Sequence, residues 1–389
     1  MRINQINATQ TLSYISILKI SLLWLPLVLW YVCGFIFTHD PRFFTQVDNI
    51  YYAAGQAWLH QQPLYHCHGN GCFVYLPTSA VFFIPLGVLP LKMAALIFRL
   101  LSLIIFTQGM YCFCRDITAY DLKRTFFIVL AVTVLLSQAA LFVGQLHMIM
   151  AGLILLSASS IAREKWWRAA IFLSVAVALK PTAIVFCALI ATLYPRTALK
   201  QIILVTVLLS SVFLTQSSHY VITQYQGFAQ EFINKMHFDM THMTHWATLF
   251  SAIAFFTKQV INGQWAFTIR LFVAFVVCFI AMRAVRTLNK TNAVYFIFTI
   301  SMCYLMLFNS RTENSDYVMM MPFIGYTFVI LFEKKQWLIL STFFIALACL
   351  LANWNLSKLI SPGNNLWLNP TVITLYTIYF IFFLRKKLC

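Results

Sequence analysis

Long apolar stretches separated by short polar segments recur along the whole sequence, and they constrain the fold more than any other feature. A bilayer span needs roughly 17–25 mostly apolar residues, and the first such stretch runs from Ile17 to Phe37. Backbone groups inside a bilayer find no water to pair with, so these stretches must be helices rather than open sheet. Charged residues make up 10% of the chain, whereas soluble domains carry about 25%. The sequence therefore predicts an all-α, polytopic integral membrane protein.

The basic residues lie in short clusters between the apolar stretches, which is typical of cytoplasmic loops and not of a nucleic-acid-binding surface. An N-terminus inside the cell makes six basic segments cytoplasmic: 115–124, 163–168, 195–200, 283–290, 333–335 and 385–387. The opposite face then receives 38–90, Gly144-Gln145, Lys180-Pro181, 216–264, 309–316 and 353–366. This scheme predicts twelve spans in one domain over residues 1–389, with both termini cytoplasmic. It requires the short apolar segment 78–90 not to cross, because crossing would invert everything after it.

Asp48 lies in the first outer loop, residues 38–90, and is one of only ten acidic residues in the chain. From Asn49 onward the apolar residues have the spacing of an amphipathic helix, which could lie flat on the membrane surface. Asp48 is then either the N-cap of that helix, a position that Asp favours, or a general base, which must reach the proton that it removes. The two roles are compatible, because a helix N-terminus keeps a carboxylate ionised.

Polar residues interrupt two of the apolar runs. Lys180-Pro181 combines an ionisable residue at membrane depth, which is costly and hence a functional candidate, with a proline that breaks the helix. Lys180 is either a lysine that snorkels from a helix end or a cation that holds a phosphate. Gln145, in the second interruption, could satisfy neighbouring backbone groups or bind hydroxyls of a substrate. Arg311 begins a charged outer loop and is either part of a solvated turn or a bidentate clamp for phosphate.

Histidines are concentrated in the second outer loop, residues 216–264. His237, His242 and His245 could be interfacial polar residues, substrate contacts or zinc ligands. Their spacing is not a recognised zinc signature, and we expect no metal site. Cys67 and Cys72 flank a Gly-Asn-Gly turn in the first outer loop and could form a metal knuckle or a disulfide. The outer compartment is oxidising, which favours the disulfide.

Six short segments of the sequence, taken in order, resemble glycosyltransferase family 87 of the GT-C superfamily, over roughly residues 40–200. The segments are Asp48-Asn49-Ile50-Tyr51-Tyr52-Ala53-Ala54-Gly55, Pro63-Leu64-Tyr65, Tyr75-Leu76-Pro77, Pro85-Leu86-Gly87-Val88-Leu89-Pro90, Gly144-Gln145 and Ala178-Leu179-Lys180-Pro181. The family includes mannosyltransferases of phosphatidylinositol mannoside synthesis. It commonly has a second proline where this chain has Thr78, so the match is weaker there.

The resemblance implies a polyprenyl-phosphate sugar donor, an active site on the outer face and a catalytic aspartate at Asp48. We accordingly predict an inverting enzyme of the inner (plasma) membrane that moves a mannose-like hexose or a pentose to a lipid or glycan acceptor, without cofactor or metal. Lys180 and Arg311 would stabilise the charge on the leaving phosphate, and Tyr51 and Tyr52 would line the sugar site or the membrane surface. The alternatives are a transporter or lipid flippase, whose sites lie at broken helices, and a non-catalytic assembly subunit.

Overall fold

The computed structural model describes residues 11–37, 46–65, 72–351, 359–360 and 366–384. Within these ranges the chain is helical and contains no strand, which confirms the prediction of an all-α fold. The helices of the N-terminal half are α1 (Tyr14–Ser21), η1 (Leu22–Trp24), α2 (Leu25–Phe37), α3 (Gln46–Leu59), α4 (Pro77–Gly87), α5 (Leu91–Ile117), α6 (Leu122–Leu136), α7 (Gln138–Val143), α8 (His147–Ala162), α9 (Trp166–Leu179), η3 (Pro181–Ala183) and α10 (Ile184–Leu193).

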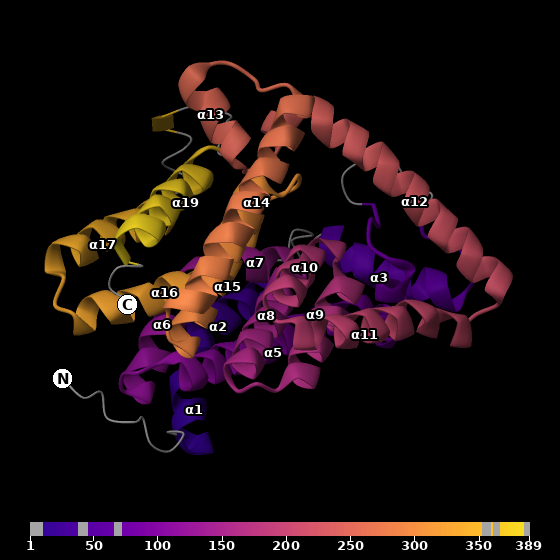
Figure 1. Cartoon of the computed structure of the whole chain (residues 1–389). Coiled ribbons are helices and arrows are strands. Elements are labelled where there is room, and N and C mark those ends of the chain that lie inside the picture. Colours follow the sequence, from indigo (N-terminus) through magenta and orange to yellow (C-terminus); the bar gives the residue numbers. More distant parts are fainter. Residues whose placement is uncertain (1–10, 38–45, 66–71, 352–358, 361–365, 385–389) are drawn as a thin grey trace.

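The second half continues with a long polar helix, α12, placed between apolar ones. In order the helices are η4 (Pro195–Thr197), α11 (Ala198–Ser211), η5 (Val212–Leu214), α12 (Ser218–Thr241), η6 (Met243–His245), α13 (Leu249–Thr257), α14 (Gly263–Thr287), α15 (Lys290–Phe308), η7 (Asn314–Met320), α16 (Met321–Glu333), α17 (Trp337–Leu351), α19 (Leu368–Tyr379) and η8 (Phe380–Leu384). Figure 1 shows α12 and α13 at the top, with α1 at the bottom.

Six helical segments in the described part of the chain are long and apolar enough to cross a membrane. They are Tyr14–Phe37, Leu91–Ile117, Pro195–Leu214, Gly263–Thr287, Lys290–Phe308 and Asn314–Glu333. Shorter apolar helices, such as His147–Ala162 and Trp166–Leu179, lie between them. This pattern confirms a polytopic membrane protein, while the total of twelve spans stays a prediction. The predicted span 125–143 is divided between α6 and α7, which meet at Ser137.

The structure brings together four of the loops that the charge pattern placed on one side. Three ion pairs join them: Arg124–Glu333, Lys290–Glu164 and Arg163–Asp116, with N···O distances of 2.8, 2.7 and 2.5 Å. Loops on opposite sides of a bilayer could not pair in this way. The grouping of these loops therefore agrees with the predicted topology, and the cytoplasmic identity of that end stays a prediction.

Helix α3 differs from the prediction in two respects. Gln46 and Val47 are already helical, so Asp48 lies within the helix and is not its N-cap. Its face with Ala54, Ala57 and Trp58 is apolar, as predicted, but that face is buried inside the protein. The indole of Trp58 donates a hydrogen bond of 3.0 Å to Thr215 and lies 5.3 Å from the ring of Tyr220. The start of the second outer loop thus covers the surface that we expected to contact lipid. Packing against protein removes Trp58 from water as fully as lipid would.

Helix α4 packs so closely on α3 that glycine is required on both sides. A Cβ atom at Gly55 would lie 2.4 Å from the carbonyl oxygen of Phe83, and one at Gly87 would lie 2.9 Å from the nitrogen of Gln56. With 11 residues, α4 is about 16 Å long, roughly half the 30 Å of a hydrocarbon core. This length favours the prediction that 78–90 does not cross the membrane.

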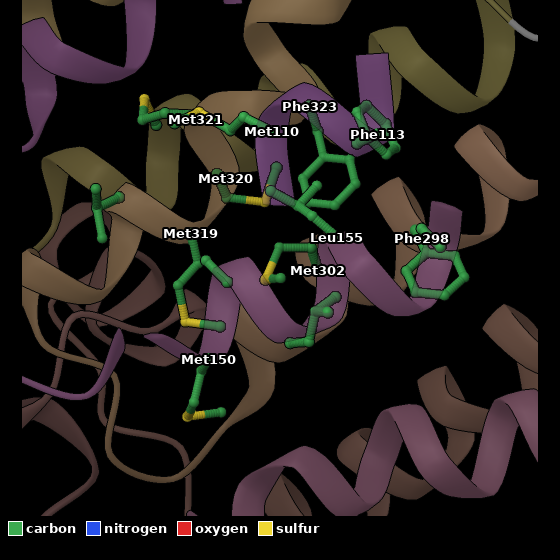
Figure 2. Close-up of a cluster of buried hydrophobic side chains, with 14 of the residues drawn as sticks. Met110, Phe113, Met150, Leu155, Phe298, Met302, Met319, Met320, Met321 and Phe323 are labelled. Atoms are coloured by element: carbon green, nitrogen blue, oxygen red, sulfur yellow. The ribbon is translucent and has the colours of Figure 1, made fainter. Parts of the chain in front are cut away.

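The core of the molecule is a cluster of methionine and phenylalanine side chains between α5, α8, α15 and the η7–α16 segment, as Figure 2 shows. Met110 and Phe113 come from α5, Met150 and Leu155 from α8, and Met302 from α15. Met319, Met320, Met321 and Phe323 enter the same cluster and are almost completely buried. Methionine fills irregular gaps well, so this core supports the short, broken helices that carry the site described below.

A glycine pair sets the distance between α5 and α8. A Cβ atom at Gly109 would lie 2.5 Å from the carbonyl oxygen of Gly152, and one at Gly152 would lie 2.6 Å from that of Ile105. Small residues allow such backbone contact between helices in a membrane, where apolar burial alone does not hold helices together.

We expect the Gly152→Leu variant to unfold at a lower temperature than the wild type. Overpacking of this kind lowers the free energy of unfolding by about 1–3 kcal/mol. The measurement is the thermal midpoint of the purified protein in detergent. Ala348→Leu is the matched control, because it adds a similar volume at an exposed position of α17. Equal midpoints for the two variants would show that α5 and α8 can separate without cost.

Candidate active site

Two of the helix breaks seen in the sequence are formed by local backbone constraints. Gly144 ends α7 with φ 68° and ψ 42°, a left-handed conformation that glycine adopts without strain. Lys180 ends α9 in an extended conformation, and Pro181 follows it at the start of η3. The break leaves carbonyl groups of α9 without helical partners, and Ser79 of α4 donates to those of Ala178 and Leu179, at 2.8 and 3.0 Å. Both breaks therefore have defined geometry.

The half-buried side chain of Lys180 and the buried side chain of His147, which lie beside these breaks, meet Asp316 in a group that we call the Lys180–His147–Asp316 triad. His147 Nε2 lies 2.8 Å from Asp316 Oδ1 and also contacts Lys180 Nζ. The carboxylate of Asp316 accepts a hydrogen bond of 3.0 Å, through Oδ2, from the backbone nitrogen of Glu313. Asp316 and His147 are only 2% and 4% exposed. Charges buried to this extent must be paired, and here an ammonium and a carboxylate share one imidazole.

Gln145 lies next to the triad and is held at both ends of its amide. Its Nε2 donates to Glu313 at 2.7 Å, and its Oε1 accepts from Ser315 at 3.0 Å. Both partners belong to the loop 309–316, which we predicted on the same face of the membrane. The amide thereby fixes that loop over the start of α8.

Tyr51 connects α3 to the triad. Its hydroxyl accepts a 3.3 Å hydrogen bond from the backbone nitrogen of Leu146, the residue before His147, and lies 3.1 Å from the hydroxyl of Tyr75. Tyr65 in turn donates to the carbonyl oxygen of Tyr75 at 2.6 Å. Burial raises the pKa of Tyr65 well above its usual value, so its hydroxyl stays a donor at every physiological pH. Aromatic hydroxyls thus connect the first outer loop to the start of α8.

Asp48 precedes Tyr51 by almost one turn of α3, and its side chain lies outside the described part of the structure. Tyr52 is half-buried and accepts a hydrogen bond of 3.1 Å from Gln56. Tyr51 and Tyr52 both line a small, mainly apolar cavity between α3 and the start of α5, together with Leu86, Leu91, Ala94, Ala95 and Phe98. Asp48 is therefore placed in the same helix as the residues that border this cavity and support the triad.

Arg311 belongs to a second cluster. Its Nε donates to both carboxylate oxygens of Asp239, at 2.9 and 2.8 Å, and its guanidinium lies 5.3 Å from the centre of the Trp246 ring. The loop 309–316 joins the two clusters, because it carries Arg311 at one end and Asp316 at the other. Of the two cations that we predicted to hold a phosphate, Lys180 thus already contacts the imidazole of His147, and Arg311 already binds the carboxylate of Asp239.

The three histidines that we predicted as possible substrate contacts, at positions 237, 242 and 245, are not brought to the triad by any contact in the described structure. His237 is exposed on α12. His242 ends that helix and stacks on Phe238, with ring centres 4.2 Å apart, while His245 lies in η6 with its ring 4.9 Å from that of His242. Among the described residues, no three His, Cys, Asp or Glu side chains are grouped so that they could hold a metal ion. Cys72 is disulfide-bonded, and Cys67, its predicted partner, lies outside the described residues.

Sequence reasoning missed His147 and Asp239. A signal was present for His147, since it is an ionisable residue at the start of an apolar run, the same reason that drew attention to Lys180. Nothing local to Asp239 identified it as the partner of Arg311 across 72 positions.

The family model of glycosyltransferase family 87 matches residues 73–310, which is more than half of the chain. The matched range includes Gln145, His147, Lys180 and Asp239, begins after Asp48 and ends just before Arg311. No curated protein matches the chain.

Proposed function

The chain belongs to glycosyltransferase family 87 and is a membrane glycosyltransferase, and from this premise we propose that its donor is a sugar carried on polyprenyl phosphate. We further propose that the sugar, a mannose-like hexose or a pentose, passes with inversion to a lipid or glycan acceptor on the outer face of the inner membrane. The observation that supports this most directly is the Lys180–His147–Asp316 triad, which holds an ammonium at a break between two apolar helices.

In the proposed reaction an acceptor hydroxyl attacks the anomeric carbon of the donor. The bond between that carbon and the phosphate oxygen breaks, the oxygen keeps the electron pair, and polyprenyl phosphate leaves. Asp48 takes the proton of the attacking hydroxyl, which it must reach within hydrogen-bond distance. The transition state therefore develops negative charge on the phosphate, and cations fixed in advance at that place stabilise it more than any other single effect.

Lys180 is our first candidate for that cation, with Arg311 as the second. A phosphate oxygen that approaches the triad would share the ammonium with Asp316, and the low polarity of the surrounding methionine core would strengthen the interaction. Arg311 offers a planar fork of donors that suits phosphate. No cofactor or metal ion has a role in this proposal, because protein cations and Asp48 perform each step.

The experiment is turnover of radiolabelled polyprenyl-phosphate sugars by the purified protein in detergent, with mannose, glucose, galactose and arabinose donors in parallel. An enzyme transfers label to an added acceptor without any gradient, whereas a transporter or flippase leaves the donor chemically intact. Intact donor in all four assays, with correctly folded protein and an acceptor extract from the producing cell, would refute the proposed chemistry.

A further inference from the structure

Three buried polar atoms around Arg311 lack hydrogen-bond partners among the described residues. They are Trp246 Nε1, Thr248 Oγ1 and Thr312 Oγ1. Thr312 and Thr248 are 0% and 1% exposed. Buried hydroxyls almost always have a partner, and a buried indole N–H usually finds one too. These three atoms belong to residues of two neighbouring segments, 246–248 and 309–316, and none of the described side chains supplies the partner that they lack.

These atoms belong to one rigid place in the fold. The backbone nitrogen of Ala247 donates to the carbonyl oxygen of Thr312 at 2.7 Å, and Tyr317 donates to the carbonyl oxygen of Ala247 at 2.8 Å. The segment 246–248 is thereby fixed to the loop 309–316. The ring of Trp246 lies beneath the guanidinium of Arg311, which Asp239 holds through both of its oxygens.

The chemical character of this place matches a sugar ring. A pyranose has an apolar C–H face, which packs on an aromatic ring, and several hydroxyls that each donate and accept hydrogen bonds. The indole only donates, the carboxylate only accepts, and a threonine hydroxyl does either. The cluster can therefore bind sugar hydroxyls both as donors and as acceptors. A phosphate offers acceptors alone and would leave the lone pairs of the threonine hydroxyls without donors, and a polyprenyl chain offers no polar group at all.

We propose that Trp246, Thr248 and Thr312, with the Arg311–Asp239 pair, form a subsite for a pyranose ring of one of the substrates. The inference rests on the proposed function, since it assigns a sugar-binding place to the same enzyme. The ring belongs either to the donor or to the acceptor, and the loop 309–316 separates it from the Lys180–His147–Asp316 triad. A buried water molecule that bridges the three atoms is the competing explanation.

The test uses three variants of the purified full chain that remove one partner each and keep the shape: Thr312→Val, Thr248→Val and Trp246→Phe. We expect each to raise one KM by about tenfold, since a hydrogen bond to substrate is lost, with the thermal midpoint unchanged or raised. A higher acceptor KM assigns the site to the acceptor, and a higher donor KM assigns it to the donor. The control is Thr223→Val, because Thr223 is exposed on α12 and bonds only to its own helix at His219.

Unchanged KM values in all three variants would overturn the subsite and leave only a buried water. A binding assay separates this result from a failure of the proposed function. Saturation-transfer NMR with the methyl glycosides of mannose, glucose, galactose and arabinose needs no turnover. Signals in the wild type that disappear in Thr312→Val and persist in Thr223→Val support the subsite even if no transfer is ever detected. No signal for any of the four in the wild type counts against it.

Discussion

Asp48→Asn is expected to lower sugar transfer by about 100-fold or more, since a general base contributes roughly 10²–10⁴ to a rate. The amide has the size of the carboxylate but cannot take the proton of the acceptor hydroxyl. The acceptor must then attack while still protonated. The measurement is the initial rate of transfer from radiolabelled donor under saturating acceptor, so that the change appears in kcat.

The control for this variant is Asp121→Asn. Asp121 caps α6, accepts from the backbone nitrogen of Arg124 at 2.7 Å and lies far from the first outer loop. The same change there removes a charge but keeps the cap, because Asn and Asp cap helices about equally well. It should change the thermal midpoint little and leave kcat intact. Asp48 lies in α3, and its replacement by Asn should likewise cost little stability. Near-normal transfer by a folded Asp48→Asn protein would refute the assignment.

Lys180→Met should reduce transfer by about 100- to 1,000-fold, the typical loss when one group that stabilises developing charge is removed. It should also destabilise the fold, because the buried carboxylate of Asp316 would lose the electrostatic attraction of the Lys180 ammonium, which contacts His147 beside it. Activity alone therefore does not separate the two effects.

The double variant Lys180→Met/Asp316→Asn separates them. It removes both charges together, so the fold should recover much of its stability while transfer stays low. Lys180→Arg keeps the charge and should retain more activity than either. Should the double variant transfer sugar at nearly the wild-type rate, Lys180 would have a structural role only, and the leaving phosphate would have to be stabilised elsewhere.

The sequence predicted the apolar helices and the grouping of the basic loops, because both depend on properties that are continuous along the chain, whereas it indicated the polar helix α12 (Ser218–Thr241) only as part of an outer loop. Apolar stretches fix the helices, and the basic clusters indicate which loops share a side, as the pairs Arg124–Glu333 and Lys290–Glu164 bear out. The breaks at Gly144 and Lys180-Pro181 were visible for the same reason, since glycine and proline act on their own backbone.

The partners of the charged residues could not be predicted in this way. Lys180 contacts His147, 33 positions earlier, and Arg311 contacts Asp239, 72 positions earlier. Which pairs form depends on how the helices pack, and that packing is set by contacts such as Gly109 on Gly152. The face of α3 shows the same limit, because an amphipathic pattern indicates burial but does not distinguish lipid from protein, and Trp58 packs against Tyr220.

The ion pairs at the basic end also bear on how the chain is made. Glu333 lies 209 residues after Arg124, and a ribosome that adds about 5–20 residues per second needs roughly 10–40 s to produce that length. During this interval Arg124 has no Glu333 to bind. The contact between α5 and α8 joins Gly109 and Gly152, which are 43 positions apart (152 − 109), so it can form within roughly 2–9 s of synthesis and hold the early helices in place. Nascent protein halted before α16 should therefore already hold α5 against α8, long before the last charges meet.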